Sequence, residues 1–207
     1  MKKILSIILV IFFMFLLPTM VQAETLRLGS RGAGVVQLQT KLNNVGFNVG
    51  KVDGIFGSMT QKSVIRFQAS RSLAMDGIVG TLTAQLLTAD SVVATAKKYI
   101  GVRYLWGGNT PSGFDCSGLT SYVFTRNGIM LPRVSRDQFN IGTSVRFENL
   151  QVGDLVFFSF TGDGMVSHVG IYIGGGQFIN ASSSRGVVIS PFTNYWKSAY
   201  VGSRRVF

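Results

Sequence analysis

The reactive side chains of this sequence are one cysteine and one histidine. Cys116 is the only Cys among 207 residues, and His168 is the only His. A thiol becomes a strong nucleophile when a neighbouring imidazole takes its proton, so this pair could attack a carbonyl carbon. The same counts exclude an internal disulfide and a structural zinc site of four Cys and His ligands. We expect no metal and no other cofactor.

The residues around Cys116 favour a helix that starts at this position. Asp115, Ser117 and Gly118 make a poor core environment, which argues against the alternative of a buried, inert thiol. One helical face then collects Leu119, Tyr122, Val123 and Arg126, and Asn127-Gly128 is a typical helix end. A helix N-terminus and an imidazolium both lower the pKa of a thiol, and the backbone N–H of Cys116 could donate to an oxyanion.

His168 opens a segment that alternates like a half-buried strand. Val169, Ile171 and Ile173 alternate with His168, Gly170 and Tyr172, which predicts that His168 points away from the Val/Ile face. The alternative is a hydrogen-bonded structural histidine.

Three glycines, Gly174-Gly175-Gly176, predict a turn that brings Asn180 beside His168 to orient the imidazole through its amide oxygen. A three-residue loop centred on Gly174 or Gly175 places both side chains on one face, opposite or diagonal. A regular two-residue loop would separate them. A strand-end or turn role is the alternative for Asn180.

The elements around these residues predict an α+β domain with helices first and an antiparallel sheet afterwards. A helix carrying Val92 to Ile100 is expected to begin at a cap on Asp90 or Ser91, which leaves a short interdomain connection. Strands are expected over residues 154–160, 166–173, 177–181, 187–190 and 200–207.

An internal repeat marks a separate N-terminal domain. The stretch from Val52 to Thr60 returns from Met75 to Thr83, 23 residues later, in the form Asp-Gly-Ile-x-Gly-x-x-Thr. Each copy predicts a tight turn that feeds a helix. With the apolar stripe Val35, Leu38, Leu42 and Val45, the repeat predicts a compact three-helix domain over residues 26–87.

Residues 1–23 have the order of a secretory signal peptide. A basic start and an apolar run from Ile4 to Leu17 end at Val21-Gln22-Ala23, and the run is shorter than a spanning helix needs. We expect cleavage after Ala23 and no membrane association afterwards; an uncleaved anchor is the alternative.

The mature chain then has 18 basic against nine acidic residues, a charge of +9. This charge favours anionic wall polymers as partners, although general solubility also explains it, and the absence of a basic run disfavours nucleic acid.

Two resemblances organise these observations. The N-terminal segment is similar to the three-helix peptidoglycan-binding domain in Leu38-Gln39, Leu42, Gly46, Asp53-Gly54, Phe56-Gly57, Thr60, Phe67-Gln68 and Asp76-Gly77. Residues 92–206 resemble the NlpC family of papain-like cell-wall peptidases in Tyr104-Leu-Trp-Gly-Gly108, Asp115-Cys-Ser-Gly-Leu119, Leu131-Pro132-Arg133, Gly153-Asp-Leu-Val-Phe-Phe158 and His168-Val-Gly-Ile-Tyr172. The implied organisation is a signal peptide (1–23), a wall-binding domain (24–88) and a papain-like peptidase domain (89–207).

The resemblance implies roles for six residues. Cys116, His168 and Asn180 would form the triad, although the third position in the family is often His. Tyr104 would lie beside the nucleophile and donate to the oxyanion, and Asp115 and Ser117 would help to hold substrate.

The implied function is that of a secreted, wall-associated endopeptidase that cuts peptidoglycan stem peptides through a thioester. The bond next to γ-D-glutamate is favoured. Cleavage of a D-alanyl cross-link, cleavage of the muramyl–alanine amide, acyl transfer, and wall binding without catalysis are the alternatives.

Overall fold

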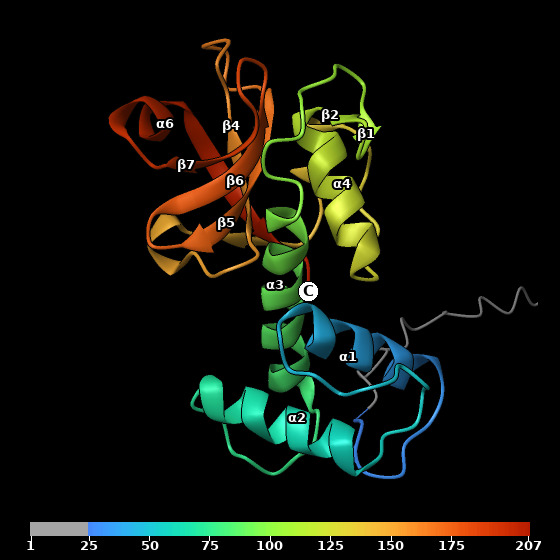
Figure 1. Cartoon of the computed structure of the whole chain (residues 1–207). Coiled ribbons are helices and arrows are strands. Elements are labelled where there is room, and N and C mark those ends of the chain that lie inside the picture. The colour runs from blue at the N-terminus through green and yellow to red at the C-terminus, as the bar shows by residue number, and fades with distance from the viewer. Residues whose placement is uncertain (1–24) are drawn as a thin grey trace, which may run out of the picture.

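A computed structural model describes residues 25–207 (Figure 1). The predicted signal peptide lies outside the described residues. The chain forms a small helical lobe and a larger lobe built on a β-sheet, and the long helix α3 (Thr81–Lys97) runs from one lobe into the other. Within residues 25–207, no helix has the length and apolar character needed to cross a membrane.

The helical lobe confirms the predicted three-helix domain. Helices α1 (Ala33–Asn44) and α2 (Ser58–Ser70) pack with the first half of α3. The predicted stripe forms its core, in which Val35 and Leu42 are fully buried together with Phe67. This apolar cluster is separate from the clusters of the sheet lobe, so each lobe has its own core.

Each copy of the sequence repeat forms the same set of hydrogen bonds, which join a helix glutamine to the loop that follows the helix. In the first copy, Gln39 of α1 donates to Asp53 Oδ1 and to the Ile55 carbonyl, and its own carbonyl accepts from the Gly54 N–H. In the second copy, Gln68 of α2 bonds to the loop at 76–78 in the same way. Each loop is thereby fixed to the preceding helix.

Helix α3 begins earlier than predicted. It begins at Thr81 and continues without a break through Asp90 and Ser91, so neither residue is a cap. Tertiary contacts use these polar side chains instead: Asp90 pairs with Arg71 at 2.6 Å, and Ser91 Oγ donates to Asn127 Oδ1 at 2.6 Å. The connection between the lobes is therefore a continuous helix, and the predicted boundary at residues 88 and 89 falls inside it.

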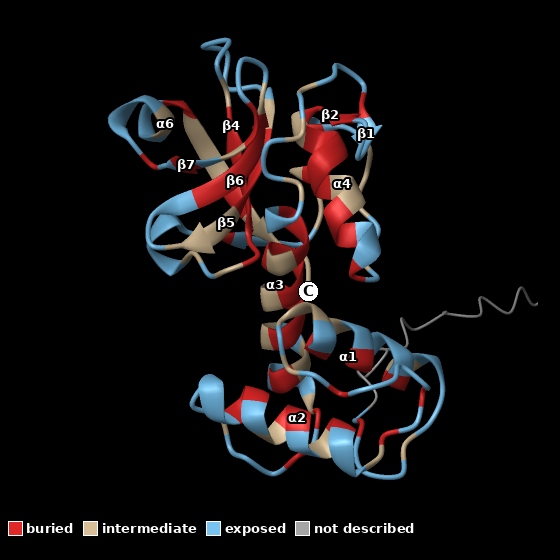
Figure 2. Ribbon diagram, viewed as in Figure 1, coloured by how far each residue is buried: buried red, intermediate tan, exposed pale blue. Residues whose placement is uncertain are grey.

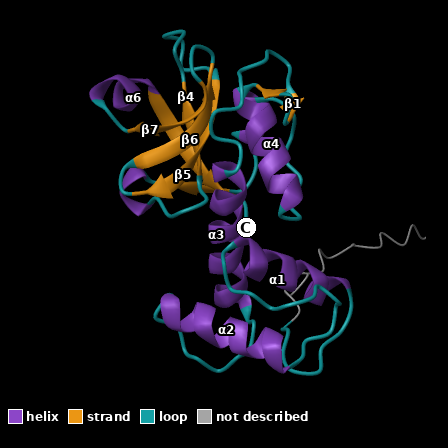
Figure 3. Cartoon of the chain, viewed as in Figure 1, coloured by secondary structure: helices purple, strands orange, loops and turns teal. Residues whose placement is uncertain are grey.

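The sheet has six antiparallel strands in the order β3-β8-β4-β5-β6-β7. Figure 3 shows that these strands belong to one lobe and that the other lobe is helical. All five predicted strands are present, namely β4 (Leu155–Phe158), β5 (His168–Gly174), β6 (Gln177–Ser182), β7 (Gly186–Pro191) and β8 (Tyr200–Arg205). The edge strand β3 (Thr143–Val145) was not predicted and pairs with β8. The shorter elements are β1 (Asn109–Thr110), β2 (Gly113–Phe114), α5 (Ser135–Gln138) and the 3₁₀ turn η1 (Phe147–Asn149).

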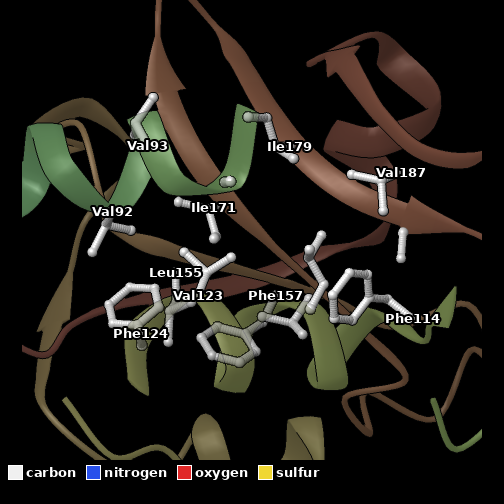
Figure 4. Packing of buried hydrophobic residues seen from close by; sticks show 14 of the residues in the cluster. Val92, Val93, Phe114, Val123, Phe124, Leu155, Phe157, Ile171, Ile179 and Val187 are labelled. Atoms are coloured by element: carbon white, nitrogen blue, oxygen red, sulfur yellow. The ribbon is translucent and has the colours of Figure 1, made fainter. Parts of the chain in front are cut away.

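Helices cover both faces of the sheet. The end of α3 and the helix α4 (Cys116–Arg126) pack on one face, where Val92, Val123 and Ile171 are fully buried (Figure 4). On the other face, α6 (Asn194–Ala199) lies over an aromatic cluster that includes Phe158 and Phe178. In the sheet lobe, burial is concentrated in the strands and in the inner sides of α3 and α4 (Figure 2). The expected α+β class is confirmed.

Candidate active site

Cys116 is the first residue of α4, as predicted, and its neighbours fix the start of this helix. The Asp115 carboxylate caps α4 by accepting from the Gly118 N–H at 2.6 Å. Gly118 is required for close packing, because a Cβ there would lie 2.0 Å from the Gly108 carbonyl oxygen. The loop before the helix therefore lies directly against its first turn.

The environment of the Cys116 thiol differs from the predicted one. Burial raises its pKa above the ordinary value, although a hydrogen bond from the backbone N–H of Val169 acts in the opposite direction. The bond to Val169 places the thiol against the first residues of β5, where His168 lies. Desolvation outweighs the helix N-terminus, so the resting group is a thiol.

His168 and Asn180 form the predicted pair. His168 Nε2 lies 3.1 Å from Asn180 Oδ1, and the Asn180 amide donates to Ser190 Oγ at 3.0 Å. Because this donation fixes the amide orientation, Oδ1 faces the ring and Nε2 carries the proton. The other ring nitrogen, Nδ1, is then an acceptor. Asn180 is fully buried, so this hydrogen bond is shielded from solvent.

The glycine turn achieves this pairing through a bulge. The register pairs Ile171 with Ile179, then shifts so that Gly174 pairs with Gln177. The connection is thus a two-residue loop, Gly175-Gly176, which by itself would place Asn180 on the wrong face. The extra residue between Tyr172 and Gly174 restores the parity. His168 and Asn180 end up diagonal on one face, as predicted for a hairpin centred on Gly175.

The face of β5 that carries His168 is aromatic. The ring lies 5.6 Å from Trp196 and 6.1 Å from Phe158, measured between ring centroids. Val169 points into the opposite core, in agreement with the predicted alternation. Burial lowers the pKa of His168 to about 4, despite the opposing effect of the Asn180 bond. At neutral pH the imidazole is therefore uncharged and able to accept a proton.

Tyr104 lies close to the thiol. Burial, followed by the neighbouring Cys116 and Asp115, raises the pKa of Tyr104, so its hydroxyl stays protonated. A parallel bridge to Phe114 holds its backbone just before the cap of α4. A protonated phenol beside the Cys116 thiol is able to donate to developing negative charge.

Asp115 and Ser117 bind a residue for which the sequence analysis predicted no role. Arg133 contacts both carboxylate oxygens of Asp115, at 3.0 and 2.6 Å, and lies 3.1 Å from Ser117 Oγ. Burial acts to raise the pKa of Asp115, but these bonds and the N–H groups of Gly118 and Gly107 outweigh it, and the pKa is lowered. Asp115 therefore holds Arg133 and the helix start together.

One cleft of about 1100 Å³ collects all six predicted residues. Arg133, Arg136 and Arg185 also line it, and Asp115 is its only acidic lining residue in the described part of the chain. Its aromatic lining residues are Tyr104, Trp106, Phe160, Tyr195 and Trp196. Arg133 belongs to a sequence motif that was recognised, whereas the aromatic residues after Pro191 gave no signal.

The described residues offer no evident metal site. Between residues 25 and 207, no three His, Cys, Asp or Glu side chains are grouped so as to hold an ion. The polar groups of the cleft include a thiol, an imidazole, an amide and a phenol, which together suit covalent acyl chemistry.

A helix-borne cysteine facing a strand-borne His/Asn pair on an antiparallel sheet defines a papain-like α+β fold. The NlpC/P60 family model matches residues 101–205, and the chain belongs to this family. A peptidoglycan-binding domain model matches residues 31–87. Both predicted resemblances are confirmed.

Two curated relatives each match more than half of the chain. "Gamma-DL-glutamyl hydrolase" of Bacillus subtilis is 51% identical over 128 residues, which cover 60% of this chain and 31% of that protein. "Murein DD-endopeptidase MepS/Murein LD-carboxypeptidase" of Escherichia coli is 48% identical over 51% of this chain and 56% of that protein. The chain thus spans less than a third of the Bacillus relative and just over half of the second.

A solved structure shares the fold. The crystal structure of an NlpC/P60 family protein from Bacillus cereus has a TM-score of 0.55 and 41% identity, covering 57% of this chain and 40% of that one.

Proposed function

We propose that this protein is a secreted, wall-associated cysteine endopeptidase that cuts peptidoglycan stem peptides. The observation that carries the proposal is the cleft in which Cys116 at the start of α4 faces the β5 segment of His168, itself held by Asn180. Family membership and the peptidoglycan-binding domain match support a wall substrate. The leader over residues 1–23 supports export.

The proposed reaction begins from a thiol and a neutral imidazole. Cys116 Sγ attacks the amide carbonyl carbon while its proton passes to His168 Nδ1, and the C=O pair moves onto oxygen. The backbone N–H of Cys116 and the Tyr104 hydroxyl donate to this oxyanion. Collapse breaks the C–N bond, and the imidazolium returns the proton to the departing amine. A thioester remains.

Water then completes the reaction. His168 takes a proton from the water as its oxygen attacks the thioester, and collapse releases the carboxylic acid and the Cys116 thiol. Asn180 keeps the ring in one orientation throughout, because its amide bonds to Ser190 and its oxygen to Nε2. Such acid–base assistance is worth roughly 10²–10⁴ in rate.

The favoured bond lies between γ-D-glutamate and the diamino acid. A γ-linked glutamate retains a free α-carboxylate, and Arg136 and Arg185 line the same cleft as Cys116. The name of the Bacillus relative supports this choice, while that of the Escherichia coli relative supports the D-alanyl cross-link as the second candidate.

Digestion of purified peptidoglycan tests both the proposed endopeptidase activity and the proposed bond. Mass spectrometry of the released fragments should show glycan-linked stems that end at D-glutamate. New D-alanyl termini would favour the second candidate, and free lactyl ends would indicate an amidase. The Cys116→Ala variant, checked for folding by circular dichroism, should release nothing; fragments from it would refute the nucleophile.

A further inference from the structure

A second cavity lies between the two lobes. It has a volume of about 660 Å³ and is lined by α1, α3 and the end of α4. None of its lining residues also lines the catalytic cleft. We call it the interlobe groove. Its size falls within the range of about 300–1,000 Å³ that is typical of pockets for whole small molecules.

Three cations and no acidic side chain line the interlobe groove in the described chain. The cations are Lys41 of α1, Lys98 at the end of α3, and Arg126 at the end of α4. None of them belongs to the three ion pairs of the described residues. The groove therefore holds positive charge that no protein carboxylate neutralises, which favours an anionic ligand.

Lys41 is the most enclosed of the three cations. Its ammonium group donates to Thr88 Oγ1 at 2.8 Å. Burial lowers the pKa of Lys41, and no opposing carboxylate contributes. An anion beside this ammonium would compensate for the water that it has lost.

The remaining lining residues make a fixed polar floor. The Asn44 amide donates to Ser91 Oγ at 2.9 Å and to Thr95 Oγ1 at 2.9 Å, and its oxygen accepts from Lys98. At the rim, Arg126 lies 5.3 Å from the Tyr122 ring centroid and donates to the Tyr122 hydroxyl at 3.1 Å. The cations are thereby held in place before a ligand arrives, which reduces the entropy lost on binding.

We propose that the interlobe groove binds a polyol phosphate segment of the wall. Lysines are common point-charge binders of phosphate, and the guanidinium of Arg126 suits phosphate oxygens. The hydroxyl and amide groups of the floor, including Thr40 and Asn43, suit a hydroxylated chain. Among the described residues, Tyr99 is the only aromatic one that lines the groove, and a single ring is a poor stacking platform for single-stranded nucleic acid.

The test compares two double variants of equal charge. Lys41→Gln/Lys98→Gln removes two groove cations, whereas Lys51→Gln/Lys62→Gln removes two exposed lysines that do not line the groove. Binding is measured by co-sedimentation with walls that carry polyol phosphate and with the same walls after hydrofluoric acid has removed it. At about 0.1 M salt the screening length is about 10 Å, so local charges dominate.

We expect the groove variant to bind phosphate-bearing walls on the order of tenfold more weakly than the parent, and the control variant to stay within about twofold. On stripped walls, the parent and both variants should bind alike. Equal losses in both variants would overturn the site in favour of general charge attraction. An equal loss by the groove variant on stripped walls would overturn the phosphate assignment in favour of peptidoglycan carboxylates. Activity on soluble stem peptides, which reports the catalytic proposal, should be unchanged.

Discussion

The proposed role of His168 as the general base predicts how activity depends on pH. A base must be unprotonated to accept the thiol proton, and burial lowers the pKa of His168 to about 4. We expect the acid limb of kcat/KM on a soluble stem peptide to have its midpoint near about pH 4. A midpoint near the ordinary histidine value of about 6.5 would contradict this prediction.

A substitution at Asn180 should shift the acid limb of the kcat/KM profile in a predictable direction. Asn180→Asp replaces the amide 3.1 Å from Nε2 with a carboxylate of the same shape. A negative charge at this distance stabilises the imidazolium, so the midpoint should move to higher pH. Ser190→Ala, which leaves the charge unchanged, serves as the control. An unchanged or lower midpoint in Asn180→Asp would count against the pairing.

The same group couples folding to pH. The folded-state pKa lies below the unfolded value, so the unfolded chain binds the proton more tightly. The free energy of unfolding therefore has its full value, as far as His168 is concerned, above about pH 6.5. As the pH falls from about 6.5 towards about 4, it decreases by on the order of 3 kcal/mol. Urea unfolding of the parent at pH 7 and pH 4.5 should show this loss, and His168→Gln should show less of it.

At the scale of elements, the hairpin of β5 and β6 depends on Gly170. A Cβ at this position would lie 2.6 Å from the Phe178 ring and 3.3 Å from Asn180 Cβ. We expect Gly170→Ala to displace β6 and to reduce the free energy of unfolding by roughly 1–3 kcal/mol. The factor by which kcat falls should be larger than the factor by which KM changes. Denaturant unfolding and steady-state kinetics would measure both effects, and a variant with parental kinetics would argue against this packing.

The turn before β4 is fixed to the last strand by a buried ion pair. Arg205 contacts both oxygens of the fully buried Asp154, at 2.8 and 2.7 Å. Arg205→Gln leaves that carboxylate without its charge partner and should reduce the free energy of unfolding by roughly 3 kcal/mol. Arg71→Gln breaks the more exposed pair with Asp90 and should change it by less than about 1 kcal/mol. Equal effects would contradict the assignment.

The sequence predicted those elements whose patterns arise locally. The residue pattern after Gln151 indicated five strands, with alternation in the segment of His168, and the residues after Cys116 indicated the start of α4, because these patterns lie in consecutive residues. Asp90 and Ser91 were misread as caps, since their actual partners, Arg71 and Asn127, are distant in sequence. For the same reason, no local signal indicated that Arg133 binds Asp115 or that β3 pairs with β8.

At the scale of the whole molecule, the two lobes share hydrogen bonds as well as a helix. Asn44 of α1 and Asn127 after α4 both bond to Ser91 and Thr95 of α3. We expect calorimetry to show one unfolding transition for the chain. Two separated transitions would show that each lobe unfolds on its own.

Helix α3 also fixes the distance between the two lobes. Its 17 residues span about 25 Å at 1.5 Å per residue, and it contains no Gly or Pro at which to bend. A flexible tether would let the catalytic cleft sample a volume around an anchored binding lobe. A rigid one confines the cleft to a shell of nearly constant radius. Scission by an anchored molecule would therefore fall at a set spacing from its point of attachment, and a new cut would require the anchor to move.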